Sequence, residues 1–157
     1  MDPSSDSRAG ELVAEAANAL ASAAPAGWSE LALSVTATVS AYDFAVSVVD
    51  ERGADPGTVV LSPVVTDAFQ ELRGVLYEEG RGTWFSARVV LRRGAAPQVS
   101  FNYDEDPQWW PPLHPAAFVR DLEVFPRDAE HVPPWLRAVL DEGEAALRAR
   151  EDGQPQR

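Results

Sequence analysis

The apolar residues of the N-terminal third follow first a helical and then a strand period. Between residues 8 and 24 they recur every three or four positions, which marks one face of a helix. From 31 to 39, and again from 42 to 48, they occupy every second position, which is typical of half-buried strands. Ser40 and Ala41 separate these two segments, so the sequence predicts a hairpin.

A second helix and a second hairpin are predicted next. A short apolar run at 59–61 is a candidate for an additional strand. Ser62 is placed to cap a helix whose apolar stripe runs to the region of Gly80. Alternation returns at 85–91 and at 99–103, on either side of a turn that contains glycine and proline.

The C-terminal third is rich in proline and ends in a helix. A short helix or strand is expected near 116–124, and the last helix should begin at Pro133 or Pro134. The whole pattern predicts an α+β fold, in the order α-β-β-(β)-α-β-β-α. We expect an antiparallel sheet of roughly four to five strands with helices packed mainly on one face.

The composition fits one domain. Within the 157 residues we expect an ordered core at about 8–150, with polar tails at 1–7 and 151–157. The absence of cysteine excludes disulfides, thiolate metal sites and a cysteine nucleophile. The N-terminus lacks the basic-then-apolar order of a signal peptide, and no apolar run approaches the roughly 20 residues that span a bilayer. We therefore expect a cytoplasmic protein.

The charge of the chain is unbalanced. All 13 basic residues are arginine, and 25 acidic residues bring the formal net charge to −12. This sign disfavours nucleic acid and anionic membranes as partners and favours encounter with a basic protein surface. Acidity that serves solubility alone is the commoner case and stays as an alternative.

The most distinctive segment joins a strand to an acidic, aromatic loop. Three consecutive carboxylates, Asp104 to Asp106, follow Tyr103, and Trp109 and Trp110 come next. Two adjacent tryptophans do not easily enter one core from an irregular loop, so we expect one indole to pack and the other to be at least partly exposed. Protein interfaces are enriched in tryptophan and tyrosine. The segment is either a partner-binding edge or a loop that closes the open end of the sheet.

The same carboxylates, together with His114, Asp121 and His131, are a candidate metal or carboxylate-enzyme site. Calcium loops usually contain a glycine and a distal bidentate glutamate, and this segment has neither at the expected spacing. No serine lies in a Gly-x-Ser-x-Gly setting, and no Gly-rich phosphate loop follows a strand. We expect neither metal nor cofactor, and a small metal-dependent or carboxylate enzyme remains an alternative.

Several short motifs, in order along the chain, resemble those of the YezG-like immunity proteins. They are Trp28 before the first hairpin, the helix-to-strand junction at Arg73, Gly82 and Trp84, and the run Phe101-Asn102-Tyr103-Asp104. Two later segments, Asp121–Arg127 and Pro133–Leu136, look like an actinobacterial branch of that family. The loop after Asp104 departs from the family, because it is richer in proline and tryptophan than in the simpler members.

The resemblance implies a cytoplasmic antitoxin that binds a cognate secreted polymorphic toxin and occludes its active site, as a stoichiometric inhibitor and not as an enzyme. The toxin would be a basic domain, such as a nuclease or a nucleotide-directed enzyme, held by a monomer in a 1:1 complex. An adaptor for an exported protein is a further alternative. The residues expected to contact the partner, the last three as a charged rim, are Tyr103, Asp104, Glu105, Asp106, Trp109, Trp110, Asp121, Glu123 and Asp128.

Overall fold

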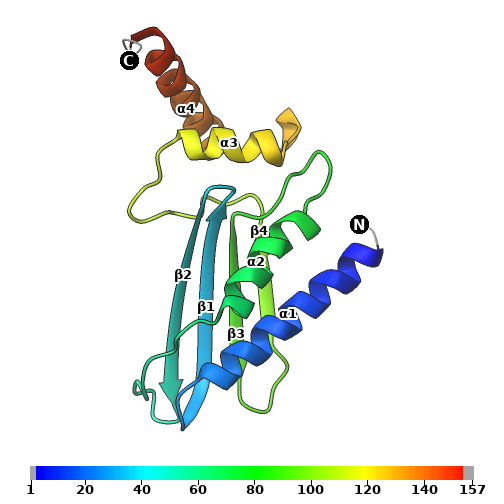
Figure 1. The fold of residues 1–157 in the computed structure, drawn as a ribbon, viewed down its shortest axis with the longest axis vertical. Helices are drawn as coiled ribbons and strands as arrows, with labels where there is room; N and C mark the ends of the chain where they lie inside the picture. Colours follow the sequence, from blue (N-terminus) through cyan, green and yellow to red (C-terminus); the bar gives the residue numbers. More distant parts are fainter. Residues whose placement is uncertain (1–2, 154–157) are drawn as a thin grey trace.

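The computed structural model describes residues 3–153 and contains a four-stranded antiparallel sheet with helices along one face and at one end (Figure 1). The α+β fold expected from the sequence is confirmed. The elements in chain order are α1 (Pro3–Ala23), β1 (Trp28–Thr38), β2 (Ala41–Asp50), α2 (Pro63–Val75), β3 (Ser86–Arg92), β4 (Gln98–Asn102), α3 (Ala116–Val124), the short 3-10 helix η1 (Ala129–His131) and α4 (Pro134–Gly153).

The strands lie in the order β2-β1-β3-β4, so the two hairpins meet at β1 and β3. In this register Leu33 lies opposite Val46 on one side and Val89 on the other. Because side chains alternate between the faces of a strand, this row of apolar residues points to the same face of the sheet. The opposite face carries small and polar side chains from β1, such as Ser34 and Thr36, which are only partly buried.

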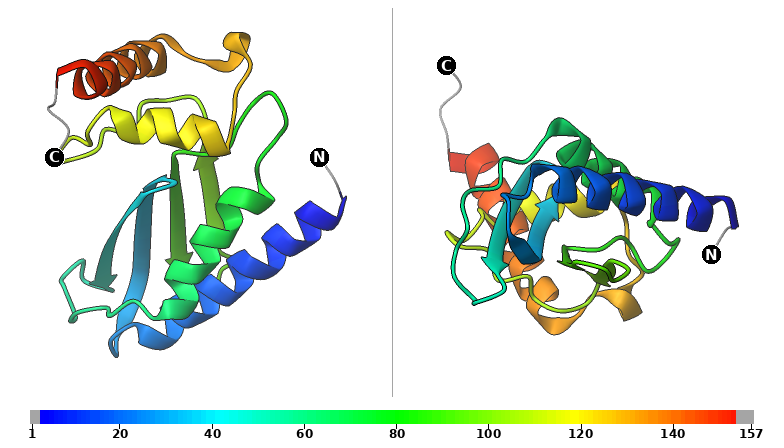
Figure 2. Two further views of the ribbon diagram at one scale, coloured as in Figure 1. Left: turned by 45° about the horizontal axis from the view of Figure 1, so that its top comes forward. Right: turned by 90° about the horizontal axis from the view of Figure 1, so that it is seen from below.

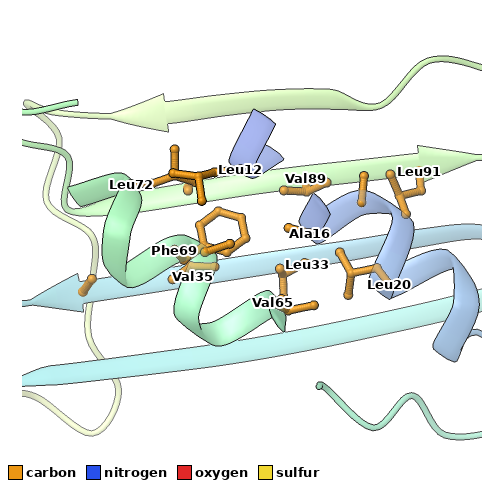
Figure 3. Packing of buried hydrophobic residues seen from close by; sticks show 14 of the residues in the cluster. Leu12, Ala16, Leu20, Leu33, Val35, Val65, Phe69, Leu72, Val89 and Leu91 are labelled. Carbon is orange, nitrogen blue, oxygen red and sulfur yellow. The ribbon is translucent and has the colours of Figure 1, made fainter. Parts of the chain in front are cut away.

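Helices α1 and α2 cover the apolar face of the sheet, and α3 and α4 lie beyond one end of it (Figure 2). Figure 3 shows the first core, in which side chains from both covering helices meet those of β1 and β3. Its labelled residues are Leu12, Ala16, Leu20, Leu33, Val35, Val65, Phe69, Leu72, Val89 and Leu91, and all are buried. Burial of such aliphatic and aromatic side chains is the main favourable contribution to folding.

A second, smaller core lies where α3 and α4 cover the end of the sheet. Its buried members are Phe85, Phe118, Leu136 and Leu140. The ring of Phe85, just before β3, lies 5.4 Å from the ring of Trp135 on α4 in an edge-to-face arrangement. Phe85 therefore joins the C-terminal helices to the sheet.

One expected strand is absent, and three helix boundaries differ from the sequence-based expectations. The run 59–61 forms no strand, and α2 ends at Val75 and not near Gly80. Helix α1 begins at Pro3 and α4 ends at Gly153, so both helices extend into the segments that were expected to be polar tails. Residues 1–2 and 154–157, which complete the expected tails, lie outside the described residues. Helices α1 and α2 lie on one face of the sheet, and α3 and α4 occupy its end.

Candidate functional site

The acidic, aromatic loop begins at Asn102, whose side chain organises the turn after β4. Its Oδ1 accepts hydrogen bonds from the backbone N–H groups of Asp104 (3.2 Å) and Glu105 (2.8 Å). Its Nδ2 donates to Ser86 Oγ and to the Glu105 carbonyl, both at 2.9 Å. Asparagine favours such turns because its side chain can replace backbone hydrogen-bond partners. The carboxylates therefore start from a turn with a defined geometry.

Tyr103 lies beneath this loop and not on its surface. The residue is 9% exposed, and its hydroxyl donates to the Leu76 carbonyl at 2.7 Å. The Arg81 guanidinium stacks 4.0 Å from the centre of the ring. Burial raises the pKa of the Tyr103 hydroxyl to about 12. The expectation that Tyr103 contacts a partner is corrected: its side chain ties β4 to the end of α2.

Asp121 is also internal, which corrects its expected place in a charged rim. It is 1% exposed and forms a bidentate pair with the fully buried Arg73, through Oδ1 to Nη1 and through Oδ2 to Nη2 (3.0 Å). Oδ1 also accepts from the Val39 backbone N–H at 2.7 Å. Arg73 in turn donates Nε to the Trp84 carbonyl at 3.0 Å. One carboxylate thus connects α3 to α2 and to the β1–β2 turn.

Arg127 is a second buried cation, and sequence reasoning gave it no role. Its side chain is 1% exposed and donates to the carbonyls of Thr83 (3.0 Å), His131 (3.0 Å) and Tyr103. Desolvation lowers its pKa from the ordinary arginine value, and the negative charge of Asp104 at 3.4 Å acts in the opposite direction. Arg127 therefore fixes the backbone below the carboxylate loop.

Two glycines in the turn after α2 allow Arg127 and Asp128 to lie close to the backbone. Gly82 has φ +89°, and a Cβ built there would lie 2.6 Å from Arg127 Nε. Gly80 has φ +83°, and a Cβ there would lie 2.6 Å from an Asp128 carboxylate oxygen. Both positions require the left-handed backbone that glycine adopts without a steric cost. The Gly-Arg-Gly sequence was the available signal for this close approach.

The two tryptophans divide as expected. Trp109 is partly buried and packs against the second core, whereas Trp110 is 85% exposed. The backbone between the carboxylates and the indoles is locally constrained, since Asp106 Oδ1 accepts from Gln108 N–H at 2.9 Å and Gln108 has φ +55°. Trp110 is thus a large apolar side chain displayed on a constrained loop.

The remaining predicted contact residues are exposed: Asp104, Glu105, Asp106, Glu123 and Asp128. The structure places Asp104 and Asp128 around the same turn, because Asp104 contacts Arg127 and Asp128 N–H donates to the Gly80 carbonyl at 2.7 Å. Glu123 lies on α3, beside a groove of about 360 Å³ that Arg127 also lines. These carboxylates form the exposed acidic part of the candidate surface.

A hollow on the open face of the sheet adjoins this loop. It has a volume of about 340 Å³ and reaches from the sheet residues Ser34 and Arg88 to Asn102 and Pro107. Arg88 contacts Ser34 Oγ at 3.4 Å and pairs with no carboxylate among the described residues. The candidate surface therefore continues from the loop onto the sheet.

The two histidines near the loop do not converge with its carboxylates. Within residues 3–153, no three histidine, aspartate or glutamate side chains converge in a group that could hold a metal ion. His114 Nδ1 instead accepts from the Ala116 N–H at 3.0 Å, at the start of α3. His131 lies 3.7 Å from Glu130 at the surface. The histidines of this region are thus placed by local contacts.

Among the described residues, no helix combines the length and the apolar character needed to cross a membrane. In comparisons with the models of known protein families and with curated proteins, the chain matched none.

The candidate site consists of an exposed indole and a set of carboxylates, on a backbone that two buried arginines hold in place. Such a combination is suited to contact with another protein.

Proposed function

We propose that this chain is a cytoplasmic immunity protein that binds a cognate secreted toxin and blocks the toxin's active site. The observation that carries the proposal is Trp110, which is 85% exposed on a constrained loop that also displays carboxylates. An indole held in water is unfavourable unless a partner covers it, and tryptophan is enriched among the residues that dominate binding energy.

The charge of the chain supports a basic partner. A net charge of −12 would steer a cationic toxin domain towards this protein and raise the association rate. Exposed carboxylates such as Glu105 and Glu123 would pair with arginine or lysine of the toxin at the rim of the interface. The resemblance of the ordered motifs to YezG-like immunity proteins points to the same class of partner.

The fixed backbone below the loop favours tight binding. Asn102 and Arg127 hold the turn that carries the carboxylates, so fewer degrees of freedom would be lost when a partner binds. Preorganisation of this kind lowers the entropic cost of association. The loop would therefore bind as a formed surface, with Trp110 entering a pocket on the toxin.

A titration of the toxin's activity tests the proposal. The toxin domain encoded beside this chain is assayed on its own substrate while the purified chain is added. We expect activity to fall linearly to zero at one chain per toxin domain. Failure to form a complex contradicts the proposal. A stable complex with full toxin activity contradicts active-site occlusion and favours the adaptor alternative.

A further inference from the structure

Strand β2 forms an edge of the sheet and is the longer of the two edge strands. It comprises the 10 residues Ala41–Asp50, whereas β4 at the other edge has 5. Figure 1 shows no helix or strand of the described chain along its outer side, and only the loop that follows Asp50 passes beside the end of the strand. An open strand edge presents backbone N–H and C=O groups that are able to pair with another strand.

The hydrogen bonds of β1 determine which groups of β2 face outward. Ala37 N–H donates to the Phe85 carbonyl (2.9 Å) and Arg93 N–H donates to the Ser29 carbonyl (3.2 Å), so the odd-numbered residues of β1 bond towards β3. Along an antiparallel strand the bonding direction alternates, so the even-numbered residues of β1 bond towards β2.

The register between β1 and β2 shows which backbone groups of β2 bond to β1 and which point away from the sheet. Thr36, Ser34 and Ala32 lie opposite Asp43, Ala45 and Ser47, and these three residues of β2 therefore bond inward. The backbone groups that point outward belong to Tyr42, Phe44, Val46 and Val48. At the end of the strand the Asp50 N–H is already used, because it donates to the Ala54 carbonyl at 2.8 Å.

This edge lacks the usual protection against pairing. Residues 41–50 contain no proline and no lysine, and the register with β1 is regular from Val48 to Ala41. On the open face of the sheet the middle of β2 shows only Asp43, Ala45 and Ser47, all exposed. Apart from Asp43, these side chains are small and uncharged.

We propose that β2 pairs with β2 of a second copy of this chain, antiparallel, about a two-fold axis at Ala45. The two four-stranded sheets would then form one continuous sheet of eight (4 + 4) strands. This goes beyond the proposed function, and it differs from the monomer that the sequence led us to expect.

The register of this pairing follows from the outward groups. With Ala45 on the axis, Tyr42 lies opposite Val48 of the second copy and Phe44 lies opposite Val46, so every outward N–H and C=O in the middle of β2 gains a partner. A register with Phe44 or Val46 on the axis leaves some of these groups without an outward-facing partner. The register with Ala45 on the axis is therefore the one in which all the outward backbone groups of mid-β2 find a partner.

The side chains on the open face agree with the same register. Ala45 meets its own copy at a non-hydrogen-bonded pair, where antiparallel strands approach most closely and a small residue fits best. Asp43 lies opposite Ser47 of the second copy, so the two aspartates do not face each other. On the open face, this register therefore brings no two like charges and no two bulky side chains of mid-β2 directly opposite each other.

Two substitutions that add the same charge test the pairing and its register. Ala45→Lys places two like charges together at the axis, whereas Ser47→Lys places each new ammonium opposite Asp43 of the second copy. Both positions are exposed in the single chain, so both variants should keep the wild-type circular dichroism spectrum. Mass is measured by sedimentation equilibrium from low micromolar to millimolar protein, at low and at high salt.

We expect the wild-type mass to rise with concentration from 17.0 kDa towards 34 kDa (2 × 17.0), and to rise further with salt because two chains of net charge −12 repel each other. Ser47→Lys should strengthen association by a factor of roughly five, and Ala45→Lys should weaken it at least as much.

Wild-type protein that stays at 17.0 kDa at every concentration and at both salt levels overturns the proposal. A dimer on which both lysine substitutions act equally overturns the β2 pairing. Neither result depends on a toxin, so failure here is distinct from failure of the proposed function.

Discussion

At the scale of single residues, two acids that look alike in the sequence have different roles. Asp121 is buried against Arg73, whereas Glu123, two positions later, is exposed. The apolar pattern near 116–124 predicts a short amphipathic element, but the partner of Asp121 lies 48 residues away in the sequence. Burial that depends on such a long-range pair has no local signal, and this is why the sequence placed Asp121 at the rim.

The buried pair leads to a prediction about stability. Removing one partner leaves an uncompensated charge in the interior, which typically costs about 3–5 kcal/mol. Asp121→Ala should therefore lower the free energy of unfolding by about this amount, because Arg73 also loses two of its hydrogen-bond acceptors.

Glu123→Ala, the matched control on the same helix, should change the free energy of unfolding by less than about 0.5 kcal/mol. Urea denaturation measures both variants. If Asp121→Ala also changes the free energy of unfolding by less than about 0.5 kcal/mol, Arg73 is not left as an uncompensated buried charge.

At the scale of elements, local patterns predicted what depends on neighbours in sequence. The alternation at 31–39 and 42–48 predicted the first hairpin, and the helix at Ala116–Val124 was one of the two outcomes expected there. The end of α2 was missed because the chain turns after Val75, with glycines at positive φ that meet Arg127 and Asp128. Because those contacts are made by residues far away in the sequence, the apolar pattern of the helix could not predict them.

The packing of α4 on α3 depends on a glycine. A Cβ built at the buried Gly143 would lie 2.7 Å from the Pro115 carbonyl oxygen and 2.7 Å from Val119 Cγ2. Alanine normally stabilises a helix interior relative to glycine by about 0.5–1 kcal/mol, but overpacking costs about 1–3 kcal/mol. We therefore expect Gly143→Ala to lower the melting temperature.

Gly10→Ala is the matched control, because this glycine lies in α1 with no heavy atom within 4 Å of its built Cβ. It should raise the melting temperature by a few degrees, since only the helix propensity changes. Thermal unfolding of both variants by circular dichroism gives the comparison. A stabilising Gly143→Ala would mean that α3 and α4 do not pack as closely as described.

At the scale of the whole molecule, the candidate surface lies where three parts of the chain meet. The loop after β4, the glycine turn after α2 and the segment before η1 are joined by Arg127 and Asp104. The sequence predicted the exposed carboxylates and the division of the two tryptophans. It did not predict the buried arginines that hold them in place, because an arginine in sequence is most often a surface residue.

If this surface binds a partner through Trp110, the binding kinetics of Trp110→Ala will show it. The variant is compared with wild type against the toxin domain encoded beside this chain, with Val60→Ala as a control at another exposed apolar residue (76% exposed).

We predict that Trp110→Ala keeps the wild-type melting temperature and association rate but dissociates faster, for a loss of about 2–4 kcal/mol. Val60→Ala should bind like wild type. If Trp110→Ala dissociates as slowly as wild type, the loop that carries Trp110 is not the binding surface.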